Sequence, residues 1–289
     1  MPTMWRRRSA ERLAALLLLA VAPAGAQMHS ERVALRLDGG RVVEAELRRP
    51  ADVDNPLPVV MLFGGFRGAA TVLDAVPAGL PLVAASFDYP FDPPRRFRFP
   101  HSFADLPALG RGIDQTFEGI RLLSAHLRAR PDIDARRITI VGASLGAPFA
   151  VVSAAELALP GVVVVHGFGR TAEVIAQQFV RKLEPRYGGW VRGPARLLAG
   201  LLAWAYDLPD AEIHAARLGS AQRALMIVAA DDELIPAAAT QALWQALHDA
   251  PAVAERIDEA GAHLRGQDDP RIADLVATAL DWMRRVGLL

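Results

Sequence analysis

The chain has 289 residues, and its 32 Lys and Arg residues are balanced by 32 Asp and Glu residues, so the formal net charge is zero. This balance excludes nucleic-acid binders whose affinity depends on a basic face. Hydrophobic residues make up 52% and charged residues 22% of the chain, which excludes a disordered protein and favours one large globular domain. Cys is absent, which excludes disulfides and a thiolate nucleophile.

The first 26 residues have the pattern of a secretory signal peptide. Arg6, Arg7 and Arg8 form a positive start, residues 13–22 are apolar, and Ala24-Gly25-Ala26 supplies small residues for cleavage. About ten apolar residues are too few to cross a bilayer, which needs about 20. We therefore expect residues 1–26 to be removed and the mature chain, residues 27–289, to be exported to the periplasm or the medium with no integral membrane segment.

The mature chain begins with a predicted β-hairpin and continues with strands that alternate with helices. The hairpin pairs residues 32–37 with residues 42–47 across Asp38-Gly39-Gly40. Buried strands are expected at 58–63, 82–87, 137–141, 161–166, 224–230 and 252–257, and helices at 113–130, 147–158, 236–249 and 270–286. The alternation predicts an α/β fold with a doubly wound, mostly parallel sheet.

A long stretch without a strand interrupts this alternation at about residues 168–222. It contains helical patterns at 172–183 and 195–206, separated by residues 185–189. Connections of this length are usually functional, so we expect a helical insertion that acts as a lid or packs on the edge of the sheet. Its apolar residues form either a lid wall or packed core; they are Leu198, Leu201, Leu202, Trp204 and Tyr206.

The strongest motif is Gly142-Ala143-Ser144-Leu145-Gly146, which has the pattern G-x-S-x-G between a buried strand and a helix. In this pattern the Ser lies on a sharp turn that lifts its hydroxyl above the sheet. Side chains two residues before and after it would collide, so both positions require Gly. The alternative is a Gly-rich turn with an incidental Ser. The motif therefore makes Ser144 the candidate nucleophile.

This motif and its setting resemble the α/β-hydrolase fold superfamily, and the similarity covers nearly the whole mature chain. The resemblance implies an acid and then a histidine after Ser144, each in a loop that follows a late strand. Asp232-Glu233-Leu234-Ile235-Pro236 is similar to the family's D-x-x-V-P turn, which favours Asp232 over Asp231 and Glu233. Capping of the following helix is the alternative role for these carboxylates.

The resemblance also implies that His263, in the loop Ala260-Gly261-Ala262-His263-Leu264, is the general base. A loop His is otherwise an ordinary surface residue. The other candidates are His29, His101, His126, His166, His214 and His248. Among them His166 ends a strand on the same edge of the sheet as Ser144, and we expect it to line the substrate pocket.

An oxyanion hole requires two backbone N–H groups. The resemblance assigns one to Leu145, the residue after the nucleophile, and the other to Gly65 or Phe66 in the loop after an early strand. Phe63 stands where the family commonly has His, which leaves this second assignment open by one residue. A separate cluster at residues 95–101, Arg-Arg-Phe-Arg-Phe-Pro-His, either recognises an anionic substrate group or is a solvated face.

These residues indicate a serine hydrolase that cleaves a small carboxylic ester or thioester through an acyl-enzyme, with no metal or organic cofactor required. A serine peptidase or amidase of the same fold is the alternative enzyme. A catalytically silent protein that uses the fold for binding is the alternative outside enzymology. The oligomeric state is not indicated by the sequence.

Overall fold

The computed structural model describes residues 28–51, 55–65, 68–91, 106–264 and 269–289. The predicted signal peptide, the cluster at residues 95–101 and the oxyanion candidate Phe66 lie outside the described residues. None of the helices in the described ranges has the length and apolar content needed to cross a bilayer.

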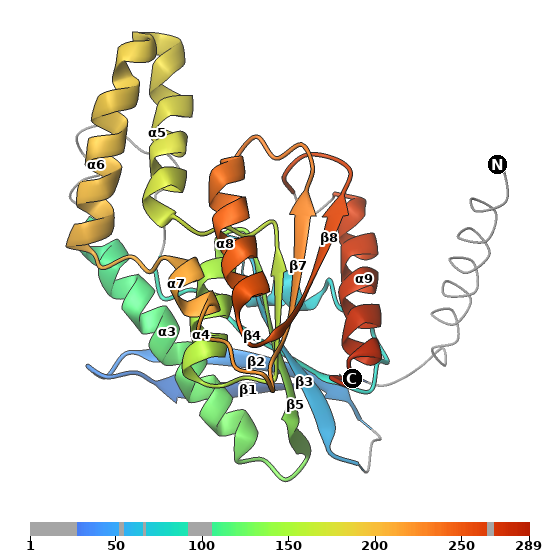
Figure 1. The fold of residues 1–289 in the computed structure, drawn as a ribbon. Helices are drawn as coiled ribbons and strands as arrows, with labels where there is room; N and C mark the ends of the chain where they lie inside the picture. The colour runs from blue at the N-terminus through green and yellow to red at the C-terminus, as the bar shows by residue number, and fades with distance from the viewer. Residues whose placement is uncertain (1–27, 52–54, 66–67, 92–105, 265–268) are drawn as a thin grey trace, which may run out of the picture.

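Eight strands form one sheet in the order β1-β2-β4-β3-β5-β6-β7-β8 (Figure 1). The strands are β1 (Met28–Arg36), β2 (Val42–Pro50), β3 (Leu57–Phe63), β4 (Val83–Phe87), β5 (Ile133–Ala143), β6 (Gly161–Val165), β7 (Arg223–Ala229) and β8 (Val253–Glu259). The β1–β2 hairpin and the β2–β4 pair are antiparallel, and all other neighbours are parallel. The predicted fold class, including the N-terminal hairpin, is confirmed.

Helices cover both faces of the sheet, which explains why the central strands are apolar on both sides. One face packs against α3 (Leu106–Arg128), α4 (Gly146–Glu156) and α8 (Ala237–Asp249), and the other against α2 (Ala69–Leu73) and α9 (Arg271–Arg285). Successive residues of β3 alternate between these two cores: Val59 and Met61 pack on the first face and Val60 on the second. Because these strands are parallel, their carboxyl ends meet at one rim of the sheet.

The insertion between β6 and β7 is entirely helical. It comprises α5 (Thr171–Tyr187), the 3₁₀ turn η2 (Gly189–Val191), α6 (Arg192–Ala205) and α7 (Ala211–Ala215). The break between α5 and α6 starts later than the predicted residues 185–189, because α5 continues through Pro185 to Tyr187 and is followed by Gly188, whose φ is +83°. Pro185 has no N–H, so it removes one i→i−4 hydrogen bond close to the C-terminal end of α5. Leu201 and Trp204 are exposed, so the interpretation of this stretch as packed core is wrong for both.

Candidate functional site

Ser144 lies on the tight turn between the end of β5 at Ala143 and the start of α4 at Gly146. Its φ is +53°, a left-handed conformation that costs about 1–3 kcal/mol for a residue with a side chain. The turn is held because the Ser144 N–H donates to the Val165 carbonyl on β6 at 2.9 Å. The side chain is half-buried, so the strained turn presents its hydroxyl at the carboxyl rim of the sheet.

The two glycines that flank Ser144 are required by the close approach of β3, β5 and α4. A Cβ on Gly146 would lie less than 3.0 Å from the carbonyl oxygen of Phe63, and a Cβ on Gly142 would lie equally close to that of Gly146. Backbone atoms cannot move aside as a flexible side chain can. The sequence prediction that both positions need Gly is therefore confirmed.

The structure brings Ser144, His263 and Asp232 together in one chain of hydrogen bonds. The His263 Nε2 atom lies 2.8 Å from the Ser144 Oγ atom, and the His263 Nδ1 atom lies 2.7 Å from the Asp232 Oδ2 atom. An ionised carboxylate only accepts hydrogen bonds, which assigns the imidazole proton to Nδ1 and leaves Nε2 free to accept from the hydroxyl. The His263 and Asp232 side chains are 4% and 10% exposed, so the pair is almost inaccessible to solvent.

Asp232 is oriented by its own loop. Its second oxygen, Oδ1, accepts from the N–H groups of Leu234 at 2.8 Å and Ile235 at 2.9 Å. Burial by itself raises the pKa of Asp232, but the hydrogen bonds from His263, Ile235 and Leu234 outweigh it and hold this pKa below its ordinary value. The neighbours Asp231 and Glu233 are exposed. Of the three acidic residues considered in the sequence, Asp232 is the one that the structure pairs with His263.

His166 occupies a different place from the one predicted. Its side chain is 1% exposed, and its Nε2 atom lies 2.6 Å from the Glu259 Oε1 atom at the end of β8. A ring that is covered in this way offers no surface to a substrate, so the expectation that it lines the pocket is corrected. Instead the ring packs against that of His263, with 5.3 Å between the ring centroids.

His166 supports the loop that carries His263. Its Nδ1 atom accepts from the Leu264 N–H at 3.3 Å, which leaves the ring proton on Nε2 to be donated to Glu259. Burial lowers the pKa of His166, the Glu259 carboxylate raises it in part, and the nearby His263 lowers it again, with a net decrease. The imidazole is therefore held neutral, in the form that accepts from Leu264.

Arg271 also holds the loop that carries His263. Its guanidinium donates to the Ala262 carbonyl at 2.7 Å and to Glu259 at 3.4 Å, and it is paired with Asp269 at 2.7 Å. Gly261, with φ +116°, leaves room for this guanidinium, because a Cβ there would lie 2.7 Å from it. The loop that presents His263 is thus held at three backbone groups: the Leu264 N–H, the Ala262 carbonyl, and the Gly261 carbonyl, which accepts from the Asp231 N–H at 3.0 Å.

Two of the candidate oxyanion donors, Leu145 and Gly65, belong to segments next to Ser144. Leu145 follows it directly as the N-cap residue of α4, where backbone N–H groups have no intrahelical partner. Gly65 follows β3, whose last residue Phe63 is in register with Gly142 on β5. The Tyr89 hydroxyl donates to the Gly64 carbonyl at 2.6 Å, and so fixes the start of this second loop from an aromatic cluster beneath it.

Three supporting residues were missed by the sequence reasoning: Tyr89, Glu259 and Arg271. Glu259 carried a weak signal, since it ends a strand two residues before the glycine of the His263 loop. Tyr89 follows β4 by two residues, at the same rim, and gave a similar signal. Arg271 is one of many arginines in this chain, and nothing in its local sequence distinguished it.

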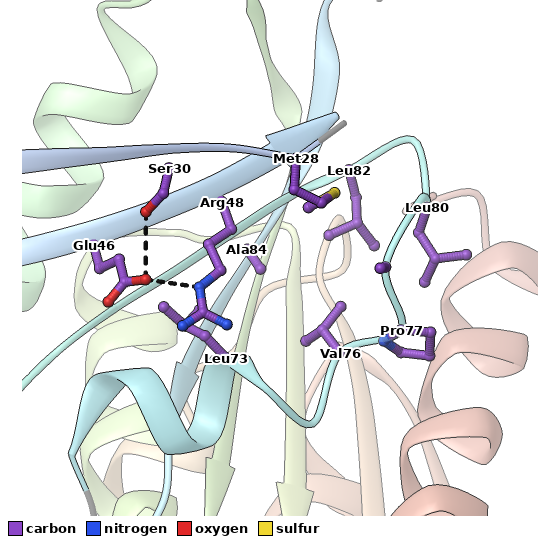
Figure 2. A pocket seen from close by; sticks show the side chains of 11 residues that line it. Met28, Ser30, Glu46, Arg48, Leu73, Val76, Pro77, Leu80, Leu82 and Ala84 are labelled. Carbon is purple, nitrogen blue, oxygen red and sulfur yellow. Dashed lines mark hydrogen bonds and ion pairs between the residues drawn. The ribbon is translucent and has the colours of Figure 1, made fainter. Parts of the chain in front are cut away.

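A hollow of about 350 Å³ lies elsewhere on the fold and contributes nothing to this site (Figure 2). Leu82 and Ala84 line it at the start of β4, whereas Ser144 follows the carboxyl end of β5. Glu46 forms part of its wall and accepts from Ser30 at 3.4 Å and from Arg48 at 2.7 Å. Across the described ranges of the chain, no three His, Asp or Glu side chains are grouped to hold a metal ion.

No family sequence model and no curated protein sequence matches this chain. Solved structures do. A dienelactone hydrolase from Klebsiella pneumoniae is 18% identical with a TM-score of 0.62, over 91% of this chain and 98% of its own. An acetyl xylan esterase from Paenibacillus sp. R4 is 16% identical with a TM-score of 0.56, over 93% of both chains.

The acylaminoacyl peptidase of Pyrococcus horikoshii is 15% identical with a TM-score of 0.63. The match covers 89% of this chain but only 42% of the peptidase, so this chain spans less than half of that longer protein. These structures share the eight-stranded sheet and its covering helices with the present chain. The chain therefore has the α/β-hydrolase fold.

Proposed function

We propose that the protein is a serine hydrolase that cleaves carboxylic esters through an acyl-enzyme formed on Ser144. The observation that carries the proposal is the hydrogen-bonded chain from Ser144 through His263 to Asp232, at 2.8 and 2.7 Å. A Ser hydroxyl is a weak nucleophile, and a base within hydrogen-bond reach whose orientation is fixed by a carboxylate is the arrangement that activates it.

In the acylation step, the Ser144 Oγ atom forms a bond to the substrate carbonyl carbon while its proton passes to the His263 Nε2 atom. Asp232 remains ionised and stabilises the imidazolium that forms. The negative charge on the carbonyl oxygen is held by the N–H of Leu145 and by a second N–H from the loop at Gly65 or Phe66. One such donor contributes about 3 kcal/mol of transition-state stabilisation.

The tetrahedral intermediate then collapses. The bond from carbon to the alcohol oxygen breaks, and the His263 proton moves to that oxygen as the alcohol leaves. In deacylation a water gives its proton to His263 as its oxygen attacks the acyl carbon, and the Ser144 Oγ atom takes the proton back when the acid is released. Ester and water are consumed, and one acid and one alcohol are produced.

Carboxylic esters are favoured over amides because of the lengths of the similar structures. The esterase and the dienelactone hydrolase are matched over 93% and 98% of their own chains. The acylaminoacyl peptidase and a similar prolyl endopeptidase are matched over only 42% and 40% of theirs. Thioesters react by the same steps and belong to the same proposal. An amidase or peptidase of the same fold is the second candidate, and a protein that only binds is the third.

Turnover of p-nitrophenyl esters of increasing acyl length, beside that of peptide p-nitroanilides, tests the proposal. We expect ester hydrolysis in the parent chain and a loss of at least 10³-fold in kcat for Ser144→Ala, because such a variant retains only binding and the oxyanion donors. Ser153→Ala, a substitution of a buried serine on α4, is the matched control and should stay within about threefold. Amide turnover without ester turnover would favour the peptidase, and no turnover of either class would favour the binding protein.

Export to the periplasm or the medium is part of the same proposal, and its support is the charged, apolar and small-residue pattern of residues 1–26. Mass spectrometry of the protein recovered from an exporting host tests it. We expect a mature N-terminus at Gln27, and a retained Met1 would contradict cleavage.

A further inference from the structure

The helical hairpin made by α5 and α6 carries an unusual amount of exposed apolar surface. Nine large hydrophobic residues are exposed in the described part of the chain, and six of them fall between residues 187 and 213. They are Tyr187, Trp190, Leu197, Leu201, Trp204 and Ile213. Trp190 is 70% and Trp204 is 81% exposed, values that soluble domains rarely tolerate for the largest apolar side chain.

Three of these residues form one apolar row, because of the helical repeat of α6. Leu197, Leu201 and Trp204 follow each other at intervals of four and three residues, which places them on one side of α6. The opposite side holds Ala195 and Ala199, which are buried. In Figure 1, α5 and α6 lie side by side and project beyond the rest of the fold.

Positive charge is concentrated on the same hairpin. Residues 170–205 contain six basic and two acidic side chains, a net charge of +4, in a chain whose net charge is zero. On α6 Arg196 is exposed, Arg192 is exposed but paired with Glu184 at 2.7 Å, and Arg186 lies over the Tyr187 ring at 5.4 Å. A groove of about 1010 Å³ between α5, α6 and the start of α8 is lined by four arginines and two glutamates. Glu173 pairs with Arg170 at 3.2 Å and Glu184 with Arg192 at 2.7 Å, which leaves Arg181 and Arg196 as its other basic groups.

From this geometry we propose that the α5–α6 hairpin is a docking surface for an anionic lipid bilayer. Trp and Tyr partition to the boundary between headgroups and acyl chains, and a helix with an apolar row beside a basic row lies in that boundary. Each Lys or Arg near an anionic surface strengthens binding by about fivefold. The exposed Trp190 and Tyr187 at the tip and the Leu201 and Trp204 row are the inserting groups, and Arg186 and Arg196 are the headgroup contacts.

The charge favours a bilayer over a second copy of this chain as the occupant. A symmetric dimer through this surface would place two hairpins of charge +4 against each other, and like charges in contact oppose association. Phosphatidylglycerol headgroups complement that charge instead. The proposal concerns binding alone and holds whether or not Ser144 hydrolyses an ester.

Vesicle binding tests the proposal directly. The protein is purified from an exporting host, its N-terminus is read by mass spectrometry, and parent and variants are compared in the same form. Sedimentation with vesicles of phosphatidylcholine alone, or mixed with phosphatidylglycerol in equal parts, gives the bound fraction. We expect the parent to bind the mixed vesicles at least tenfold more tightly, with a blue shift of Trp fluorescence.

Two double variants and one control make the test specific. Trp190→Ser with Trp204→Ser should lower binding to the mixed vesicles at least tenfold, and Arg186→Gln with Arg196→Gln should remove the preference for phosphatidylglycerol. The matched control is Val42→Ser with Val253→Ser, two exposed apolar residues elsewhere, and should bind as the parent does. Circular dichroism verifies that each variant is folded.

The opposite results would overturn the proposal. A parent chain that does not bind mixed vesicles, or a Trp variant that binds them as tightly as the parent, would show that the hairpin is not a lipid-docking surface. A parent that sediments as a dimer which the Trp substitutions dissociate would assign the surface to a second copy.

Discussion

Asp232→Asn replaces the carboxylate with an amide of the same shape, and the surrounding hydrogen bonds determine how that amide must lie. The position of Oδ1 accepts two backbone N–H groups, from Leu234 and Ile235. An NH₂ group placed there would face two donors and leave both unpaired, at a cost of about 1–3 kcal/mol each. The amide oxygen therefore stays at Oδ1, and the NH₂ group faces the Nδ1 atom of His263.

An NH₂ group in that position can only donate, so it selects the tautomer of His263 in which Nδ1 is the acceptor and Nε2 carries the proton. Nε2 then cannot accept the proton of Ser144. The corresponding substitution in serine proteases lowers kcat about 10⁴-fold, which is equivalent to about 5.4 kcal/mol of transition-state stabilisation. We expect a loss of this order in kcat, with little change in KM.

Steady-state kinetics on a p-nitrophenyl ester measures this effect, and Asp231→Asn is the matched control because Asp231 is adjacent and exposed. We expect the control to retain activity within about twofold of the parent, since surface substitutions rarely change the fold. If Asp232→Asn kept more than a tenth of the parent kcat while folded, the tautomer reasoning would be refuted.

Three further outcomes are expected. Tyr89→Phe removes the hydrogen bond to the Gly64 carbonyl and should lower kcat about tenfold while lowering the free energy of unfolding by about 1 kcal/mol; unchanged kcat would separate Tyr89 from the oxyanion loop. Glu259→Ala leaves the His166 N–H unpaired and should lower the unfolding free energy by about 1–3 kcal/mol in urea titrations. Glu255→Ala, on the same strand but in an exposed ion pair, should lower it by less than about 1 kcal/mol. Equal losses would contradict the buried pairing of Glu259 with His166. The pKa of His166 is lower in the folded chain than its ordinary value, so its contribution to stability is present above about pH 6.5 and is lost as pH falls toward the folded pKa. The unfolding free energy should therefore decrease between pH 7 and 5, with a smaller slope in His166→Gln than in the parent. Identical slopes would exclude this role.

The predicted sheet and most of its helices agree with the structure because their signals are local. The parallel strands are short apolar runs, and the covering helices have a clear 3.6-residue period. The short helices α2 and α7 have five residues each, too few for such a period to be detected. The antiparallel pairing of β2 with β4 depends on contacts between distant segments, which no local pattern encodes.

The residues of the candidate site also differ in whether the sequence could predict their roles. Ser144 could be found because a steric requirement fixes glycines at both sides of it, and Asp232 and His263 because their order along the chain follows the family resemblance. The burial of His166 could not be found, since it depends on Glu259 being brought to it across β7 by the strand order β6-β7-β8. A histidine at a strand end has the same local sequence whether it faces a substrate or a buried carboxylate.

The central claim is that His263 activates the Ser144 hydroxyl as a nucleophile, and covalent labelling tests it most directly. A fluorophosphonate probe is incubated with the native chain, and mass spectrometry locates the adduct. We expect one adduct per chain, on Ser144, with labelling slowed at least 10³-fold in His263→Ala and absent in Ser144→Ala. A parent chain that is not labelled, or a Ser144→Ala variant labelled as readily as the parent, would contradict the claim.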